Sequence, residues 1–84
     1  MTQIKIYSTT WCAFCKAEKH WLDEQGVKYT DVNIETDQAA ADEMMKLSGQ
    51  MGVPFTVLTK DDGTKASMVG FDQSWLAKEL ALTA

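Results

Sequence analysis

The stretch TTWCAFCKAEKH, Thr9–His20, contains both cysteines of the chain, separated by two residues. It follows Gln3–Ser8, a run with apolar residues at alternate positions that is typical of a strand, and it leads into residues with helical spacing. Cys12 and Cys15 are therefore predicted to lie where a strand turns into a helix. A Cys-x-x-Cys pair in such a place can exchange electrons, bind a metal or form a structural disulfide.

Periodicity and turn residues predict seven elements in the order β-α-β-α-β-β-α. The expected strands cover residues 3–8, 27–34, 54–60 and 64–69, and the expected helices cover residues 13–25, residues 37–48 and a closing segment with Leu76 and Leu80. A helix between the first two strands makes them parallel, and the tight Asp61-Asp62-Gly63 turn makes the last two antiparallel. The predicted fold class is α/β, a single domain of residues 1–84 with a mixed four-stranded sheet and helices on both faces.

The helix ends are also predicted from the sequence. Four apolar residues recur at three- and four-residue spacing and indicate the first helix: Phe14, Ala17, Trp21 and Leu22. Gly26 is expected as the C-cap of this helix. Thr36 or Asp37 is expected to cap the second helix, which Gly49 stops. Asp72 is expected to cap the third helix.

Composition excludes two classes of partner. The formal net charge is −4 and hydrophobic residues make up 45% of the 84 residues, so the chain lacks the basic clusters that bind nucleic acid without sequence preference. No stretch approaches the ~18 apolar residues of a membrane span, and the first residues do not have the pattern of a signal peptide. We expect a cytoplasmic monomer without nucleic-acid or membrane partners, in a compartment where structural disulfides are rare.

The place of the cysteines favours thiol chemistry. The first turn of a helix presents unpaired N–H groups and a partial positive charge. An exposed Cys12 sulfur at that position is expected to have a pKa below the free-thiol value of about 8.5, whereas Cys15, one turn in, points toward the protein. Cys12 would attack a substrate disulfide, and Cys15 would then resolve the mixed disulfide and form the redox-active Cys12–Cys15 disulfide. Lys16 is a possible cationic partner of Cys12, although a solvated surface lysine is favoured.

Other interpretations remain open. A zinc site needs four ligands, and the two cysteines and single histidine of the chain would supply them only in a dimer. A structural disulfide would close a very small loop and add little stability. An iron–sulfur or other metal-binding module and a redox-sensing interaction domain are further alternatives. His20 is expected to be a surface residue, and since no acid–base helper is identified, proton transfer is assigned to water. No bound cofactor or metal is expected.

With these features in place, the chain resembles the glutaredoxins of the thioredoxin-fold superfamily over its entire length. The strand, the Cys-x-x-Cys, the helix, the Val53-Pro54 pair before the third strand and the glycine-containing turn before the last helix occur in the order of that family. The resemblance implies a thioredoxin fold with a cis Pro54 that faces the cysteines. It also implies that the backbone of Val53 pairs with an extended substrate.

The resemblance further implies a groove beside the cysteines. Gly70, Phe71 and Asp72 would form its third wall, and Trp11 would flank it, unless Trp11 is a half-buried packing residue. Trp21 and Trp75 are assigned to packing. The substrate-binding residues implied in this way are Thr10, Trp11, Phe14, Val53, Pro54, Gly70, Phe71 and Asp72.

Four positions depart from glutaredoxins that use glutathione. Thr9 replaces a lysine, Gly52 replaces a threonine, and Val69 and Gln73 replace a glycine and an acidic residue of the turn. The Gly-Phe of this turn is similar to that of NrdH-type redoxins, which draw electrons from thioredoxin reductase and feed ribonucleotide reductase. The resemblance thus implies a dithiol oxidoreductase for protein disulfides, recycled by thioredoxin reductase and NADPH. The alternative reductant is glutathione or another low-molecular-weight thiol.

Overall fold

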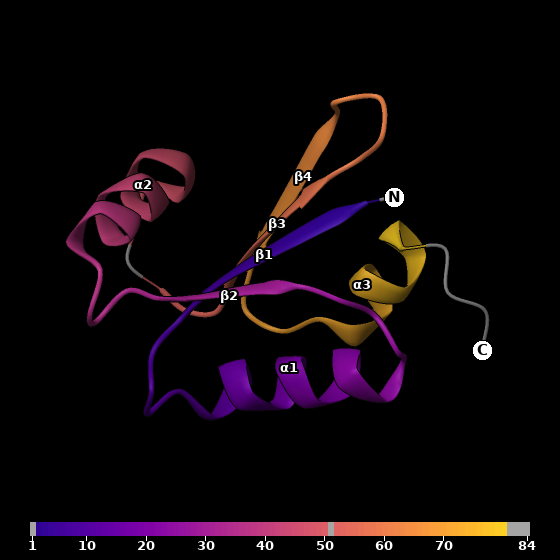
Figure 1. Ribbon diagram of the computed structural model, residues 1–84, viewed down its shortest axis with the longest axis horizontal. Helices are drawn as coiled ribbons and strands as arrows, with labels where there is room; N and C mark the ends of the chain where they lie inside the picture. The colour runs from indigo at the N-terminus through magenta and orange to yellow at the C-terminus, as the bar shows by residue number, and fades with distance from the viewer. Residues whose placement is uncertain (1, 51, 81–84) are drawn as a thin grey trace.

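A computed structural model describes residues 2–50 and 52–80 as a sheet with helices on both faces (Figure 1). The elements are β1 (Gln3–Ser8), α1 (Ala13–Glu24), β2 (Thr30–Asn33), α2 (Gln38–Ser48), β3 (Phe55–Thr59), β4 (Lys65–Val69) and α3 (Gln73–Glu79). The strands lie in the order β2-β1-β3-β4, with β1 parallel to β2 and all other neighbours antiparallel. The predicted class, element order and strand directions are confirmed. Within the described ranges, no helix is long and apolar enough to cross a membrane.

Alternation along β1 divides the core between the two faces of the sheet. Ile4 and Ile6 point to the face covered by α1 and α3, where they pack with Leu22. Tyr7 points to the opposite face, where it packs with Met44 of α2. In Figure 1, α2 lies on the other side of the sheet from α1 and α3. Each face therefore has its own small core, as the period of two in a strand dictates.

The strand register gathers four loops at one edge of the sheet. Ser8 lies opposite Asn33, and Tyr7 lies opposite Phe55, which in turn lies opposite Val69. The ends of β1, β2 and β4 therefore meet the beginning of β3. The segments that contain the cysteines, the Val-Pro pair and the turn before α3 all leave the sheet at this edge.

The buried face of α1 contains Cys15, which is predicted to point toward the protein. The buried residues of α1 are Cys15, Glu18 and Leu22. Phe14, one of the apolar residues whose spacing indicates the helix, has 68% of its surface exposed. Residues 15, 18 and 22 also have helical spacing, and α1 turns this stripe to the sheet. Trp21 then lies at the border of the core, where it is partly buried.

The predicted ends of α2 are confirmed, whereas the C-cap of α1 is Gln25, and Gly26, the C-cap expected from the sequence, follows it with a φ of 70°. One strand is also shorter than expected. Asp37 is the N-cap of α2, its carboxylate accepting the Ala40 N–H at 3.1 Å, and Gly49 closes α2 in the left-handed region with φ of 73°. The strand expected over residues 27–34 is reduced to Thr30–Asn33. These four residues pair with β1, and among the described residues β2 is an edge strand.

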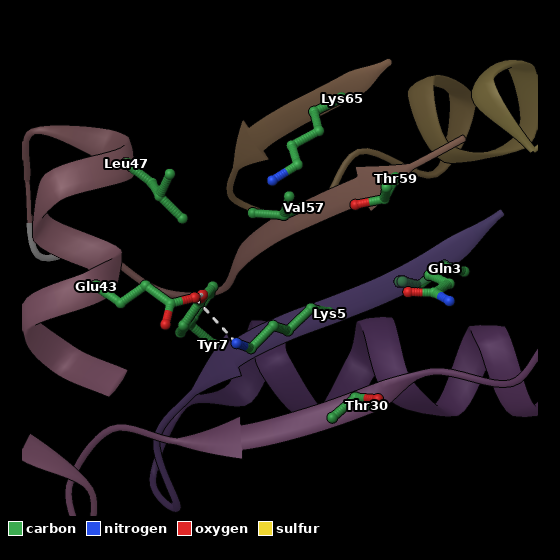
Figure 2. A pocket seen from close by; sticks show the side chains of 10 residues that line it. Gln3, Lys5, Tyr7, Thr30, Glu43, Leu47, Val57, Thr59 and Lys65 are labelled. Carbon is green, nitrogen blue, oxygen red and sulfur yellow. Dashed lines mark hydrogen bonds and ion pairs between the residues drawn. The ribbon is translucent and has the colours of Figure 1, made fainter. Parts of the chain in front are cut away.

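A polar cluster ties α2 to the sheet. The carboxylate of Glu43 accepts a hydrogen bond from the Tyr7 hydroxyl and another from the Lys5 ammonium, the latter at 3.0 Å. Figure 2 shows Glu43 reaching from α2 toward β1, beside a pocket of about 350 Å³. This pocket occupies the part of the sheet that α2 leaves open, and no predicted site residue lines it.

Candidate functional site

The two cysteines lie at the start of α1 and are joined by a hydrogen bond. Cys12 is the N-cap of α1, with extended φ and ψ of −78° and 113°, and its sulfur accepts the backbone N–H of Cys15 at 3.1 Å. Serine, threonine, asparagine or aspartate usually supplies the acceptor at this position. The Cys12 sulfur, the candidate reactive atom, therefore also caps the N-terminus of α1. Both cysteines are free thiols.

The two sulfurs differ in access and in acidity. Cys12 is 6% exposed and Cys15 is fully buried. The expectation of an exposed Cys12 sulfur is therefore wrong, but Cys12 remains the more exposed of the two residues. Burial, supported by the interaction with Cys12, raises the pKa of the Cys15 thiol to about 12, while the backbone of Thr9 acts in the opposite direction. At neutral pH, Cys15 thus keeps its proton.

Hydrogen bonds to the end of β2 and to the loop after it hold the segment before Cys12. The backbone N–H of Thr10 donates to the Glu35 carboxylate at 2.5 Å, and the Asn33 side chain donates to the Thr10 hydroxyl at 2.9 Å. The Cys12 N–H also donates to the Thr9 carbonyl at 3.4 Å. These contacts anchor the turn that presents Cys12. The polar groups of Thr10 are used within the protein, and its role in substrate binding stays a prediction.

Two exposed aromatic side chains neighbour Cys12 in the sequence. Trp11 is 72% exposed and Phe14 is 68% exposed, in a protein whose other tryptophans are partly buried. The alternative of a half-buried Trp11 is therefore wrong. Large apolar side chains with such exposure are common where proteins bind partners.

The Val53–Pro54 peptide bond is cis, as the family resemblance implies. Pro54 is fully buried, and its carbonyl accepts the Gly70 N–H at 2.7 Å. Gly70 has a φ of 91°, a backbone conformation that only glycine adopts without strain. The structure thereby joins the Val-Pro segment to the turn before α3.

The rest of that turn contributes to packing. The Phe71 ring lies against Trp21 of α1, with ring centroids 6.2 Å apart. The Asp72 carboxylate accepts the Trp75 N–H at 3.0 Å and caps α3, as predicted. Contacts of Phe71 and Asp72 with a substrate stay predictions.

A buried carboxyl group on α1 was missed by the sequence analysis. Glu18 is fully buried, and its Oε2 accepts the Thr56 hydroxyl at 2.7 Å. Within residues 2–50 and 52–80, its other oxygen, Oε1, is buried without a hydrogen-bond partner. Burial raises the pKa of Glu18, and the Thr56 hydrogen bond opposes this shift. The sequence does contain one indication of this burial: Glu18 lies three residues after Cys15 and four before Leu22, so that all three share one face of the helix.

The remaining candidates lie on the surface. The His20 side chain is 77% exposed and lies 3.4 Å from Glu24 on the same helix, as expected of a surface histidine. Lys16 is exposed. In the part of the chain that the structure describes, no group of three or more histidine, cysteine or acidic residues is arranged to hold a metal ion.

Comparison with known sequences relates the chain to one family. The model of the glutaredoxin family matches residues 4–61. The chain is 39% identical over 75 residues to a glutaredoxin-like 8.6 kDa protein of the rubredoxin operon of Clostridium pasteurianum, which covers 89% of this chain and 93% of that protein. It is 32% identical over 75 residues to the glutaredoxin-like protein NrdH of Lactococcus lactis subsp. cremoris, with coverage of 89% and 96%.

Solved structures agree in fold. Methanoredoxin of Methanosarcina acetivorans superposes with a TM-score of 0.82 at 21% identity, covering 95% of this chain and 85% of that one. A mutant of the thioredoxin-like protein BC3987 superposes with a TM-score of 0.79 at 22% identity, covering 99% and 100%. The fold is the thioredoxin fold.

The burial of Glu18 predicts an unusual dependence of stability on pH. Because its pKa is raised in the folded protein, the destabilising contribution of the carboxylate is absent below the unfolded pKa of about 4.5 and grows as the pH rises through the folded pKa. In chemical unfolding, Glu18→Gln is expected to gain more stability over the wild type at pH 8 than at pH 4. The exposed Glu24→Gln on the same helix is the matched control. An equal difference at both pH values for Glu18→Gln contradicts the assignment.

Proposed function

Because the chain belongs to the glutaredoxin family, we propose that it is a dithiol oxidoreductase that reduces disulfides in proteins, with Cys12 as nucleophile and Cys15 as resolving thiol. The hydrogen bond from the Cys15 N–H to the Cys12 sulfur carries this proposal. A negative sulfur accepts such a bond more strongly than a neutral one. The unequal burial of the two sulfurs supports the division of roles.

The proposed cycle has two exchange steps. The Cys12 thiolate attacks one sulfur of the substrate disulfide, the substrate S–S bond breaks, and the first substrate thiolate leaves and takes up a proton. Cys15 then loses its proton and attacks the Cys12 sulfur of the mixed disulfide. This step forms the Cys12–Cys15 disulfide and releases the second substrate sulfur. Two electrons pass from the protein to the substrate, and an external reductant returns them.

The surroundings of Cys12 support an extended polypeptide as substrate. Trp11 and Phe14 flank Cys12 in the sequence and offer exposed apolar surface, whereas Cys12 itself is only 6% exposed. We propose that a flexible segment of the substrate inserts its disulfide between these aromatic side chains. Val53 precedes the cis bond at the same edge of the sheet and would pair with that segment through its backbone. Gly70, Phe71 and Asp72 would border it, and Thr10 would complete the groove.

We propose thioredoxin reductase, fed by NADPH, as the reductant. Thr9, which stands where glutathione-using glutaredoxins have a lysine, is 6% exposed and offers no charge to a glutathione carboxylate. Gly52 stands where those proteins have a threonine, and a Cβ built there lies 3.3 Å from the Val69 side chain. Similarity to NrdH of L. lactis also favours this reductant and makes ribonucleotide reductase one candidate substrate. A reducing cytoplasm suits the proposed cycle.

Single-cysteine variants test the two roles. Cys12→Ser is expected to lower the reduction of a protein disulfide, such as that of insulin, by more than about 100-fold, because a hydroxyl is a poor replacement for a thiolate nucleophile. Cys15→Ser is expected to accumulate a mixed disulfide with the substrate, visible by mass spectrometry as an adduct that a reducing agent removes. Circular dichroism of both variants controls for folding. A Cys12→Ser protein that reduces the substrate at the original rate contradicts the assignment.

A comparison of reductants tests the electron source. The oxidised protein is incubated with NADPH and thioredoxin reductase, or with NADPH, glutathione and glutathione reductase, and NADPH consumption is followed. We expect turnover to be at least about tenfold faster with thioredoxin reductase, because the family's cationic contact for glutathione is absent at Thr9. Turnover with glutathione alone contradicts the proposed reductant, while leaving the dithiol chemistry in place.

A further inference from the structure

One buried carboxyl group has no structural explanation. Glu18 is fully buried on α1, and only one of its two carboxylate oxygens has a partner, the Thr56 hydroxyl at 2.7 Å. Among the described residues, Oε1 is one of two buried side-chain oxygens without a hydrogen bond, the other being Oγ1 of Thr9. Burying a carboxyl group with an unsatisfied oxygen destabilises a protein. An apolar residue would suit a purely structural position better.

Glu18 follows the resolving residue Cys15 by one helical turn on α1. Cys15 and Glu18 are both on the buried stripe of α1, and residues three apart on a helix have Cβ atoms about 5–6 Å apart. Side chains on a helix lean toward its N-terminus, which directs Glu18 toward the turn that contains Cys15. Thr56 holds Oε2 from the strand below, and Oε1 is left for another group.

The proposed cycle requires a proton acceptor at this place. Cys15 must become a thiolate before it can attack the mixed disulfide, yet it is buried and its pKa is raised to about 12. Water has poor access to a fully buried thiol. His20, the only histidine of the chain, is 77% exposed on another side of α1.

We propose that Glu18 is the buried proton acceptor for Cys15 in the resolving step, an inference that rests on the proposed dithiol function. The Cys15 proton passes through one buried water to the free Oε1 of the Glu18 carboxylate. The Cys15 thiolate then attacks the Cys12 sulfur, the bond between Cys12 and the substrate breaks, and the Cys12–Cys15 disulfide forms. The released substrate thiolate takes the proton back from Glu18, so atoms, charge and electrons balance.

Two ion pairs join the elements on this side of the sheet, and their side chains are more exposed than Glu18. Lys19 donates to Asp31 of β2 at 2.9 Å, and Lys60 lies 2.9 Å from Glu79 of α3. The pKa of Glu18 is raised by burial and lowered by the Thr56 hydroxyl. A base is most effective when its pKa lies near the working pH, and an upward shift moves Glu18 in that direction.

Stopped-flow measurement of a single turnover tests the proposal. Reduced protein is mixed with a disulfide-containing protein, and formation and decay of the mixed disulfide are followed from pH 5 to pH 9. Glu18→Gln, which keeps the volume and an acceptor for Thr56, is expected to form the mixed disulfide at the wild-type rate but to resolve it at least about tenfold more slowly at pH 7. In the wild type the resolving rate levels off above the pKa of Glu18. In the variant it keeps rising about tenfold per pH unit.

Two further variants separate proton transfer from a structural role. Thr56→Val removes the hydrogen bond that lowers the pKa of Glu18. In this variant the resolving rate is expected to level off at a higher pH than in the wild type. The exposed Glu24→Gln is expected to match the wild type. A Glu18→Gln variant with an unchanged resolving rate, or with a slower rate of the same pH dependence, overturns the proposal and leaves the dithiol function intact. Failure of the wild type to form any mixed disulfide overturns both.

Discussion

The structure depends on the hydrogen bond between the Cys15 N–H and the Cys12 sulfur at the start of α1. A helix begins well only where an acceptor satisfies its free N–H groups, and in this chain the acceptor is also the candidate nucleophile. The contact that begins α1 therefore involves the same sulfur that the proposed function makes the nucleophile. The register of the sheet brings the cis Val53–Pro54 bond and Gly70 to the same edge of the sheet as the cysteines. Strand pairing therefore positions the loops around the cysteines.

Glu18 lowers the stability of the fold at a position where the proposed activity needs it. A domain of 84 residues has a thin core, and a buried carboxyl group with one unpaired oxygen weakens it. Thr56 offsets part of this by donating to the other oxygen. Residues that oppose stability without a structural gain are expected where function requires them. The buried stripe of α1 thus combines a packing residue, Leu22, with two groups that the proposed chemistry uses.

The order of elements could be predicted from the sequence because local signals agree. Each signal involves residues close together in the sequence. Examples are the capping carboxylate of Asp37, the left-handed conformation of Gly49 and the alternating burial along β1. The orientation of α1 could be predicted in part, since Cys15 faces the protein as expected. The apolar spacing alone does not show that Phe14 is exposed and that Glu18 is buried. The hydrogen bond that the buried Glu18 accepts comes from Thr56, 38 residues away in the sequence. No local pattern predicts that contact.

The central claim is that Cys12 is the reactive sulfur and Cys15 the protected one. The most direct measurement is alkylation of the reduced protein at pH 7 with a limiting amount of iodoacetamide, followed by peptide mapping. Because Cys15 is fully buried with a pKa of about 12, Cys12 is expected to be labelled at least about tenfold faster. Labelling of Cys15 at an equal or greater rate contradicts the account.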